Sequence, residues 1–143
     1  MADIYHDLSI KAPASEVFRR ISTPEGLDGW WSKNAAGEPG EGAELELDFG
    51  PGYLWRATVS KWVPDTDIEY EMIDAADDWL GTRVGFRLEE SAGLTKVSFR
   101  HTGWAEPSEH FRISSYCWAM YLRILKRWIE RGEVVPYDQR PAA

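Results

Sequence analysis

The strongest constraint on the fold is a series of segments in which apolar and polar residues alternate, followed by one long amphipathic segment. Alternation with a period of two is typical of half-buried β-strands. It predicts strands over residues 3–11, 44–49, 53–63, 68–72, 79–89 and 95–101. Short turns rich in Gly, Pro and Asp separate most of them, which indicates an antiparallel meander. Such a sheet has one apolar face, and that face needs a cover.

The last alternating segment is followed by the element that can provide this cover. From Phe111 to Ile129, apolar residues recur every three or four positions, which predicts a helix with one apolar face. Ser108 is placed to cap its start and Gly132 to end it. We therefore expect an α+β fold in which the sheet packs on this helix.

Two shorter helices are expected after the first strand. Val17, Phe18 and Ile21 form the apolar side of the first, and Thr23 is a suitable N-cap for the second. Residues 34–42 are rich in Gly and Pro, which predicts a loop. Residues 133–143 are expected to be irregular. With 143 residues, the chain is expected to form a single domain over 1–143.

Charge and cysteine content exclude several classes of protein. The net charge is −8, which disfavours binding to nucleic acids and to anionic membranes. The stretch 114–129 contains three cations and cannot span a bilayer, and the N-terminus does not resemble a signal peptide. Cys117 is the only cysteine, so no intramolecular disulfide can form. These features predict a cytoplasmic protein without nucleic-acid or membrane partners.

Four stretches of the chain resemble a known family in their order and spacing. They are Ile10–Pro13 with Glu16–Phe18, Thr23–Glu25 through Gly29–Trp31, Gly52–Trp55, and Thr95–Trp104. With this element order, the chain resembles the START-related SRPBCC superfamily. Within that superfamily it is most similar to the AHSA-like group, homologues of an activator of a heat-shock-chaperone ATPase.

The resemblance implies a helix-grip fold and several alternative functions. In that fold a curved antiparallel sheet of about six strands wraps around the long C-terminal helix, with a cavity between them. The superfamily includes lipid and polyketide carriers, aromatase/cyclases, plant hormone receptors and co-chaperone domains. The first and last strands are neighbours in this fold, which would bring His6 and His101 close together.

Sequence motifs give little support for an enzyme. The chain lacks the motifs of serine hydrolases, nucleotide-binding loops and zinc proteases. The alternation places His6 and His101 on the inward face of their strands. Each histidine has two interpretations: a general base, or a polar group at the rim of the core whose hydrogen bonds are satisfied within the protein. Cys117 is expected to act as a small apolar residue. We predict no catalytic residue, no metal site and no cofactor.

The aromatic residues are the main functional indication, because eight of the 143 residues are Trp. Inward-facing aromatics with a few polar groups are typical of small-molecule pockets, although a completely filled core would have the same pattern. The predicted ligand-binding residues are Trp55, Tyr70, Met72, Phe86, Phe99, His101, Phe111, Ser114, Trp118 and Tyr121.

Three functions therefore remain open. The first is binding of a small apolar, aromatic or lipid-like ligand between the sheet and the C-terminal helix. The second is a co-chaperone or stress-related interaction module with a filled core. The third is a polyketide cyclase-like enzyme that uses His101 or His6 with Tyr70.

One further helical stripe bears on possible partners. Ile113, Tyr116 and Met120 are either an exposed surface for a chaperone or a second copy, or they are covered by the short helices or the tail. We expect a monomer or a weak homodimer.

Overall fold

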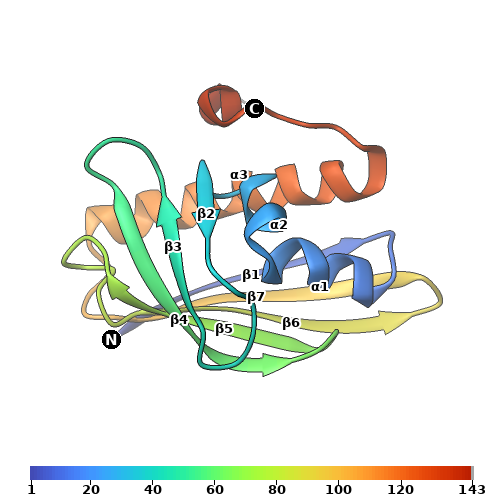
Figure 1. The fold of residues 1–143 in the computed structure, drawn as a ribbon, viewed down its shortest axis with the longest axis horizontal. Helices are drawn as coiled ribbons and strands as arrows, with labels where there is room; N and C mark the ends of the chain where they lie inside the picture. Colours follow the sequence, from blue (N-terminus) through green and yellow to red (C-terminus); the bar gives the residue numbers. More distant parts are fainter. Residues whose placement is uncertain (143) are drawn as a thin grey trace.

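The computed structural model describes residues 1–142 and shows the α+β arrangement expected from the sequence (Figure 1). One long helix lies along one face of a sheet, and two short helices follow the first strand. The elements are β1 (Ala2–Ile10), α1 (Ala14–Ser22), α2 (Pro24–Asp28), β2 (Asn34–Ala36), β3 (Glu44–Asp48), β4 (Leu54–Val63), β5 (Asp67–Asp74), β6 (Arg83–Ser91), β7 (Leu94–Trp104), α3 (Glu109–Arg131) and the 3-10 helix η1 (Tyr137–Ala142).

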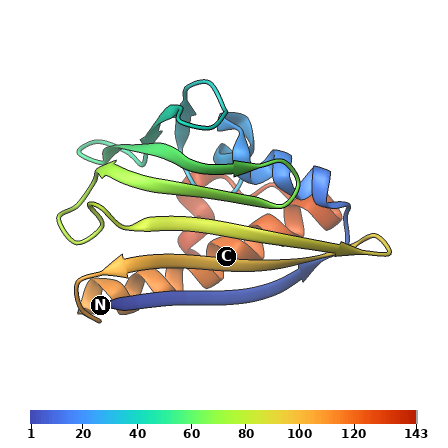
Figure 2. The ribbon, with the colours of Figure 1, turned by 90° about the horizontal axis from the view of Figure 1, so that it is seen from below.

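All strands belong to one antiparallel sheet with the order β1-β7-β6-β5-β4-β3-β2. Seen from below, the sheet curves across the molecule with α3 behind it (Figure 2). The sheet is open, because β1 and β2 form its two edges. The first and last strands are neighbours as expected, with Ile4 opposite His101 and Ile10 opposite Thr95.

Two details differ from the sequence-based expectation. The sheet has seven strands rather than about six, because the start of the segment predicted as a loop over 34–42 forms β2 on β3. There Ala35 is buried, although the segment is rich in Gly. The tail over 133–143 is not irregular throughout, because η1 begins at Tyr137. Neither feature has a hydrophobic periodicity long enough to detect in the sequence.

The helix boundaries follow from local hydrogen bonds that the sequence predicts correctly. The Ser108 hydroxyl accepts a hydrogen bond from the Phe111 N–H at 3.3 Å, which caps α3. The Thr23 hydroxyl accepts one from the Gly26 N–H at 3.0 Å at the start of α2. Gly132 ends α3 with φ of 69°, a left-handed conformation that glycine adopts without steric cost. Within residues 1–142, no helix is long and apolar enough to cross a membrane.

The short helices are fixed to the rest of the molecule by buried aromatic side chains. The Tyr70 hydroxyl donates to the Ile21 carbonyl at 2.6 Å, and the Trp30 indole N–H donates to the Arg20 carbonyl at 2.9 Å. On α3, the Trp128 ring lies 4.1 Å from the Arg20 guanidinium carbon and packs directly against Gly29. These contacts hold α1 and α2 at the C-terminal end of α3.

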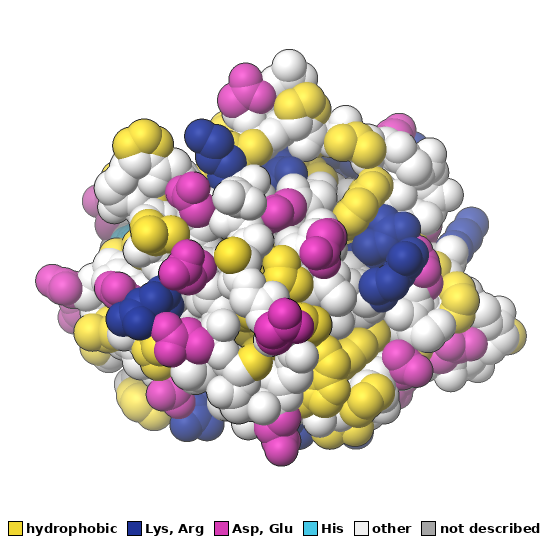
Figure 3. All heavy atoms as spheres, in the orientation of Figure 1, with side chains coloured by type: hydrophobic (Ala, Val, Ile, Leu, Met, Phe, Trp, Pro, Cys, Tyr) yellow, Lys and Arg dark blue, Asp and Glu magenta, His cyan; other side chains and the backbone are white. Residues whose placement is uncertain are grey.

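The outer face of the sheet carries cross-strand ion pairs. Arg100 Nη2 lies 3.0 Å from Asp67 and 3.1 Å from Glu69, and Lys61 Nζ lies 3.1 Å from Asp67. Asp67 is only 3% exposed, so its charge depends on these two cations. On the face drawn in Figure 3, acidic and basic side chains are interspersed with hydrophobic ones.

The contact between Gly29 and Trp128 gives a stability prediction. A β-carbon at Gly29 would lie 2.3 Å from the Trp128 ring, so Gly29→Ala should destabilise the fold by about 1–3 kcal/mol through overpacking. The backbone there is ordinary right-handed helix, with φ of −75°, so the clash is the only expected cost. The measurement is chemical denaturation of Gly29→Ala, Trp128→Leu and the double variant.

Because Leu leaves room for the added methyl group, the double variant should lose less stability than the sum of the two single changes. Additive losses would show that Trp128 does not contact Gly29 in this way.

Candidate functional site

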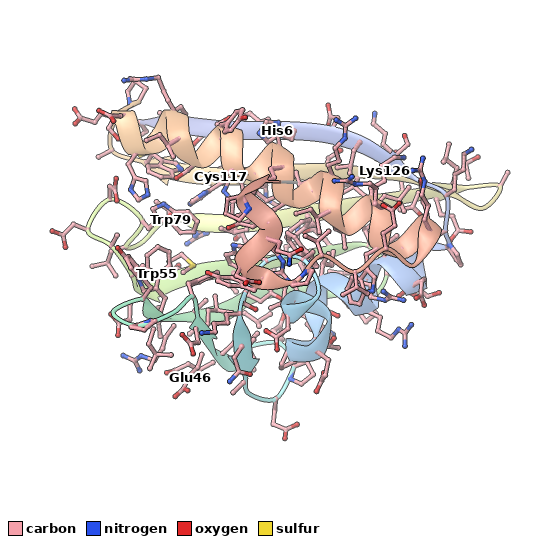
Figure 4. The ribbon with its side chains drawn as sticks, turned by 90° about the horizontal axis from the view of Figure 1, so that it is seen from above. His6, Glu46, Trp55, Trp79, Cys117 and Lys126 are labelled. Carbon is pink, nitrogen blue, oxygen red and sulfur yellow. The ribbon has the colours of Figure 1, made fainter. Side chains whose placement is uncertain are left out.

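A pocket of about 300 Å³ opens between the N-terminal half of α3 and the end of the sheet formed by β3 and β4. Figure 4 shows Cys117, Trp79 and Trp55 in succession from α3 across to β4. Most of the lining is aromatic. The lining residues are Trp31, Phe49, Tyr53, Trp55, Trp79, His110, Ile113, Ser114, Cys117, Trp118, Tyr121 and Tyr137.

Separate segments build the walls of this pocket. Helix α3 contributes residues at spacings of three and four, which places them on one side of the helix. Trp55 comes from β4, Trp79 from the connection between β5 and β6, and Tyr137 from η1. The Tyr137 hydroxyl donates to the Phe49 carbonyl at 2.9 Å, which fixes the tail beside the pocket.

Ring contacts hold the aromatic walls together. The Trp118 ring centroid lies 4.6 Å from Phe99, 5.1 Å from Trp31 and 6.0 Å from Trp79. Trp79 in turn lies 5.0 Å from Trp55. Three of these pairs are tilted and the Trp79–Trp118 pair is stacked, and ring pairs at such distances are favourable beyond their area burial. These ring contacts hold the side chains of the pocket walls against one another.

A chain of hydrogen bonds lies directly behind the pocket wall. Trp118 Nε1–H donates to His101 Nδ1 at 3.0 Å, so His101 carries its own hydrogen on Nε2. That N–H donates to Thr82 Oγ1 at 2.8 Å, and the Thr82 hydroxyl donates to the Trp79 carbonyl at 2.6 Å. Trp79 Nε1–H donates to Ser114 Oγ at 3.3 Å.

This arrangement keeps His101 neutral. Burial lowers the pKa of His101 to about 3, with a smaller contribution from the nearby His110. Both ring nitrogens have protein partners. His101 is therefore a structural residue that orients Trp118, and it is not placed to act as a general base.

The other histidine at the pocket is arranged differently. His110 lines the pocket, its Nδ1 lies 2.7 Å from Asp78 Oδ2, and both side chains are partly exposed. Nearby, burial raises the pKa of the Cys117 thiol, which disfavours the nucleophilic thiolate. The pocket is thus apolar inside, with its most polar group at the entrance.

Four of the ten residues predicted to bind a ligand line this pocket: Trp55, Ser114, Trp118 and Tyr121. The other six lie outside the pocket lining. They are Tyr70, Met72, Phe86, Phe99, His101 and Phe111. Five of these are buried in the core where sheet and helix converge, and Phe111 is partly buried against Trp104. The ring nitrogen Nε2 of His6 lies 3.1 Å from the Ser115 carbonyl, away from the pocket.

Several pocket residues were not among the sequence predictions, for identifiable reasons. Trp79 was expected to begin a strand, but β6 begins at Arg83 and Trp79 folds inward from the preceding turn. Tyr137 belongs to the tail, which has no periodic pattern. Cys117 and His110 do share the α3 face of Ser114, so helical spacing contained a signal for both.

Among residues 1–142, no group of three or more His, Cys, Asp and Glu side chains is arranged to hold a metal ion.

Residues 11–130 match the family model described as "Activator of Hsp90 ATPase homolog 1-like protein". The chain belongs to this family. No curated protein sequence matches it.

Among solved structures, the Aha1 dimer from Colwellia psychrerythraea is 27% identical, with a TM-score of 0.84, and the match covers 93% of this chain and 99% of that one. CalU16 from Micromonospora echinospora is 21% identical, with a TM-score of 0.74, and the match covers 96% of this chain and 83% of CalU16. DynU16, described as "a putative protein in the dynemicin biosynthetic locus", is 20% identical, with a TM-score of 0.76, and the match covers 94% of this chain and 50% of DynU16. The two latter likenesses show the fold.

The buried neutral His101 predicts a specific dependence of stability on pH. Its pKa is about 3 in the folded protein and near 6.5 in an unfolded chain, so between these values the unfolded state binds more protons. Stability should therefore fall as the pH falls from about 6.5 toward 3. One such group changes the unfolding equilibrium constant by up to about tenfold per pH unit.

Denaturant titrations over this pH range provide the measurement. His101→Gln removes the titrating group while keeping an amide that can hydrogen-bond, so its stability should depend less steeply on pH. Equal slopes in wild type and His101→Gln would contradict a neutral buried His101.

Proposed function

We propose that this protein binds a small apolar, aromatic ligand in the pocket between α3 and the β3–β4 end of the sheet. The observation that carries the proposal is a pocket of about 300 Å³ whose walls are mainly aromatic and already packed in place. Ligand pockets are commonly apolar with a few polar groups, and this volume is at the lower end of their range. The family description and the related structures support the fold that forms such a pocket.

The proposed binding energy comes mainly from burial of apolar surface. Apolar area removed from water contributes about 25 cal/mol per Å², less the cost of ordering the ligand and the side chains around it. Because the rings of Trp31, Trp55 and Trp118 are held by one another or by neighbouring rings, the ordering cost on the protein side is small. A flat, rigid molecule would make the best use of such walls.

A neutral dye that fluoresces in apolar surroundings, N-phenyl-1-naphthylamine, provides the test. Its emission should rise on binding, and Cys117→Phe should reduce its affinity about tenfold or more, because the larger ring occupies the pocket. Ala119→Phe is the matched control on the same helix, since Ala119 is exposed and outside this pocket. Circular dichroism checks that both variants fold. Equal dye affinity in folded Cys117→Phe and wild type would contradict the proposal.

A second proposal, carried by a different observation, is an interaction with a chaperone. Along α3, Tyr116 is 80% exposed, Ile113 at the edge of the pocket is 50% exposed, and Met120 is partly exposed. Exposed apolar side chains gathered on one helix can form an interaction surface. The family description names an activator of Hsp90 ATPase homologue, which makes a chaperone of that class the partner to test.

Capture of a purified Hsp90-class chaperone on the immobilised protein tests this second proposal. Tyr116→Glu should abolish capture, because it places a charge in the centre of the apolar stripe. Tyr5→Glu on β1 is the matched control, since Tyr5 is also well exposed but lies away from α3. Loss of capture in both variants, or in neither, would contradict the assignment of this surface.

The remaining expectations have narrower support. The structure of one related protein is a dimer, which is compatible with a weak homodimer here, and gel filtration at several concentrations would test it. The lone thiol is compatible with a cytoplasmic location. A cyclase-like activity through His101 and Tyr70 has the least support, because both groups lie outside the pocket and their polar atoms have protein partners.

A further inference from the structure

The polar group at the mouth of the pocket indicates which aromatic ligands it favours. The Asp78 carboxylate can only accept a hydrogen bond, so Nδ1 of His110 carries the hydrogen in the 2.7 Å contact between them. In the neutral ring, Nε2 is then an acceptor. Nε2 makes no hydrogen bond to any of residues 1–142.

Neighbouring rings hold the His110 imidazole in place. Its centroid lies 6.3 Å from that of Trp79 with an angle of 31° between the planes, and 5.9 Å from that of Trp104 with an angle of 90°. With Nδ1 held by Asp78, the ring has three separate restraints. The entropy cost of ordering this side chain when a ligand bonds to Nε2 is therefore small.

Two other polar groups of the lining already have partners within the protein. Ser114 Oγ accepts from Trp79, and the Tyr137 hydroxyl donates to the Phe49 carbonyl. The lining, taken from residues 1–142, includes no Lys or Arg that could balance an anionic ligand. The Asp78 carboxylate next to the entrance further disfavours a negative charge there.

We propose that the pocket selects planar aromatic molecules that carry a neutral hydroxyl group, which donates its hydrogen bond to Nε2 of His110. This inference rests on the proposed function, because it assumes that the aromatic walls bind the rest of the ligand. Asp78 is a positioning residue that fixes the hydrogen on Nδ1. His110 is the group that distinguishes a hydroxylated ligand from the same ring without a donor.

Calorimetric titration with three naphthalenes of similar size tests this selection. The probes are 2-naphthol, which has the donor, 2-methoxynaphthalene, which lacks it, and 2-naphthoate, which is anionic. At about pH 8, 2-naphthol should bind about tenfold more tightly than 2-methoxynaphthalene. The anion 2-naphthoate should bind most weakly.

His110→Phe keeps an aromatic ring in the wall but removes the acceptor. In this variant 2-naphthol should lose its advantage, so that the ratio of its affinity to that of 2-methoxynaphthalene falls to about one. His6→Gln is the matched control, because it removes a histidine outside this pocket and should retain the preference.

The role of Asp78 requires a measurement that a general structural effect would not change. Imidazole ¹⁵N chemical shifts should show the hydrogen of His110 on Nδ1 in wild type and in Asp78→Asn, whose amide oxygen still accepts. In Asp78→Ala the hydrogen should redistribute to Nε2, and the preference for 2-naphthol should decrease.

The outcomes separate this inference from the proposed function. If neither 2-naphthol nor 2-methoxynaphthalene binds wild type, the ligand-binding function itself is wrong. If both bind with equal affinity, or if 2-naphthoate binds best, the pocket binds aromatics but the hydroxyl selection is wrong. A preference that persists in folded His110→Phe would also overturn it.

Discussion

The packing of Trp118 against the concave face of the sheet is the interaction on which the rest of the structure depends. Its ring contacts Phe99 on β7, Trp31 after α2 and Trp79 in the β5–β6 connection. Its N–H completes the hydrogen-bond chain through His101 and Thr82. One side chain thus joins α3, the sheet and the N-terminal helices, and it satisfies a buried imidazole whose pKa is low because of its burial.

This interaction also divides the space between helix and sheet into two parts. On one side of Trp118, Phe86 and Phe99 are buried and pack against each other. On the other side, Trp31, Trp55 and Trp79 leave a pocket that is open to solvent. A buried core and an open pocket are therefore both present. The proposed ligand site lies where the sheet curves away from the helix.

The tail gives the pocket part of its wall. Arg140 is 3% exposed and donates hydrogen bonds to the carbonyls of Asp28, Ser32 and Val135. Burial lowers the pKa of its guanidinium, although these carbonyls satisfy its donors. Held in this way, η1 places Tyr137 beside Phe49. The family model matches residues 11–130, and Tyr137 lies after this range. The family match therefore does not include this part of the pocket wall.

Much of the fold follows from local patterns in the sequence. The alternation of Ile68, Tyr70 and Met72 determined a strand and its inward face, and Ser108 and Gly132 determined the ends of α3, because these signals act between neighbouring residues. Candidate pocket residues on α3 could be predicted from helical spacing, as Ser114, Trp118 and Tyr121 were. The sequence also predicted that any pocket would be lined mainly by aromatic residues, because eight of the 143 residues are Trp, but it left open whether the core contains a pocket.

Only the tertiary structure decided which inward residues line the pocket and which are packed away from it. Tyr70 and Trp55 have the same inward parity, yet Tyr70 bonds to Ile21 in the core and Trp55 faces the pocket. Likewise, two histidines have opposite situations: His101 has both nitrogens bonded by residues distant in sequence, and His110 keeps one nitrogen without a partner among residues 1–142. These differences arise from the curvature of the sheet, the turn that carries Trp79 and the packing of the tail. Each depends on contacts between segments that no local pattern in the sequence relates.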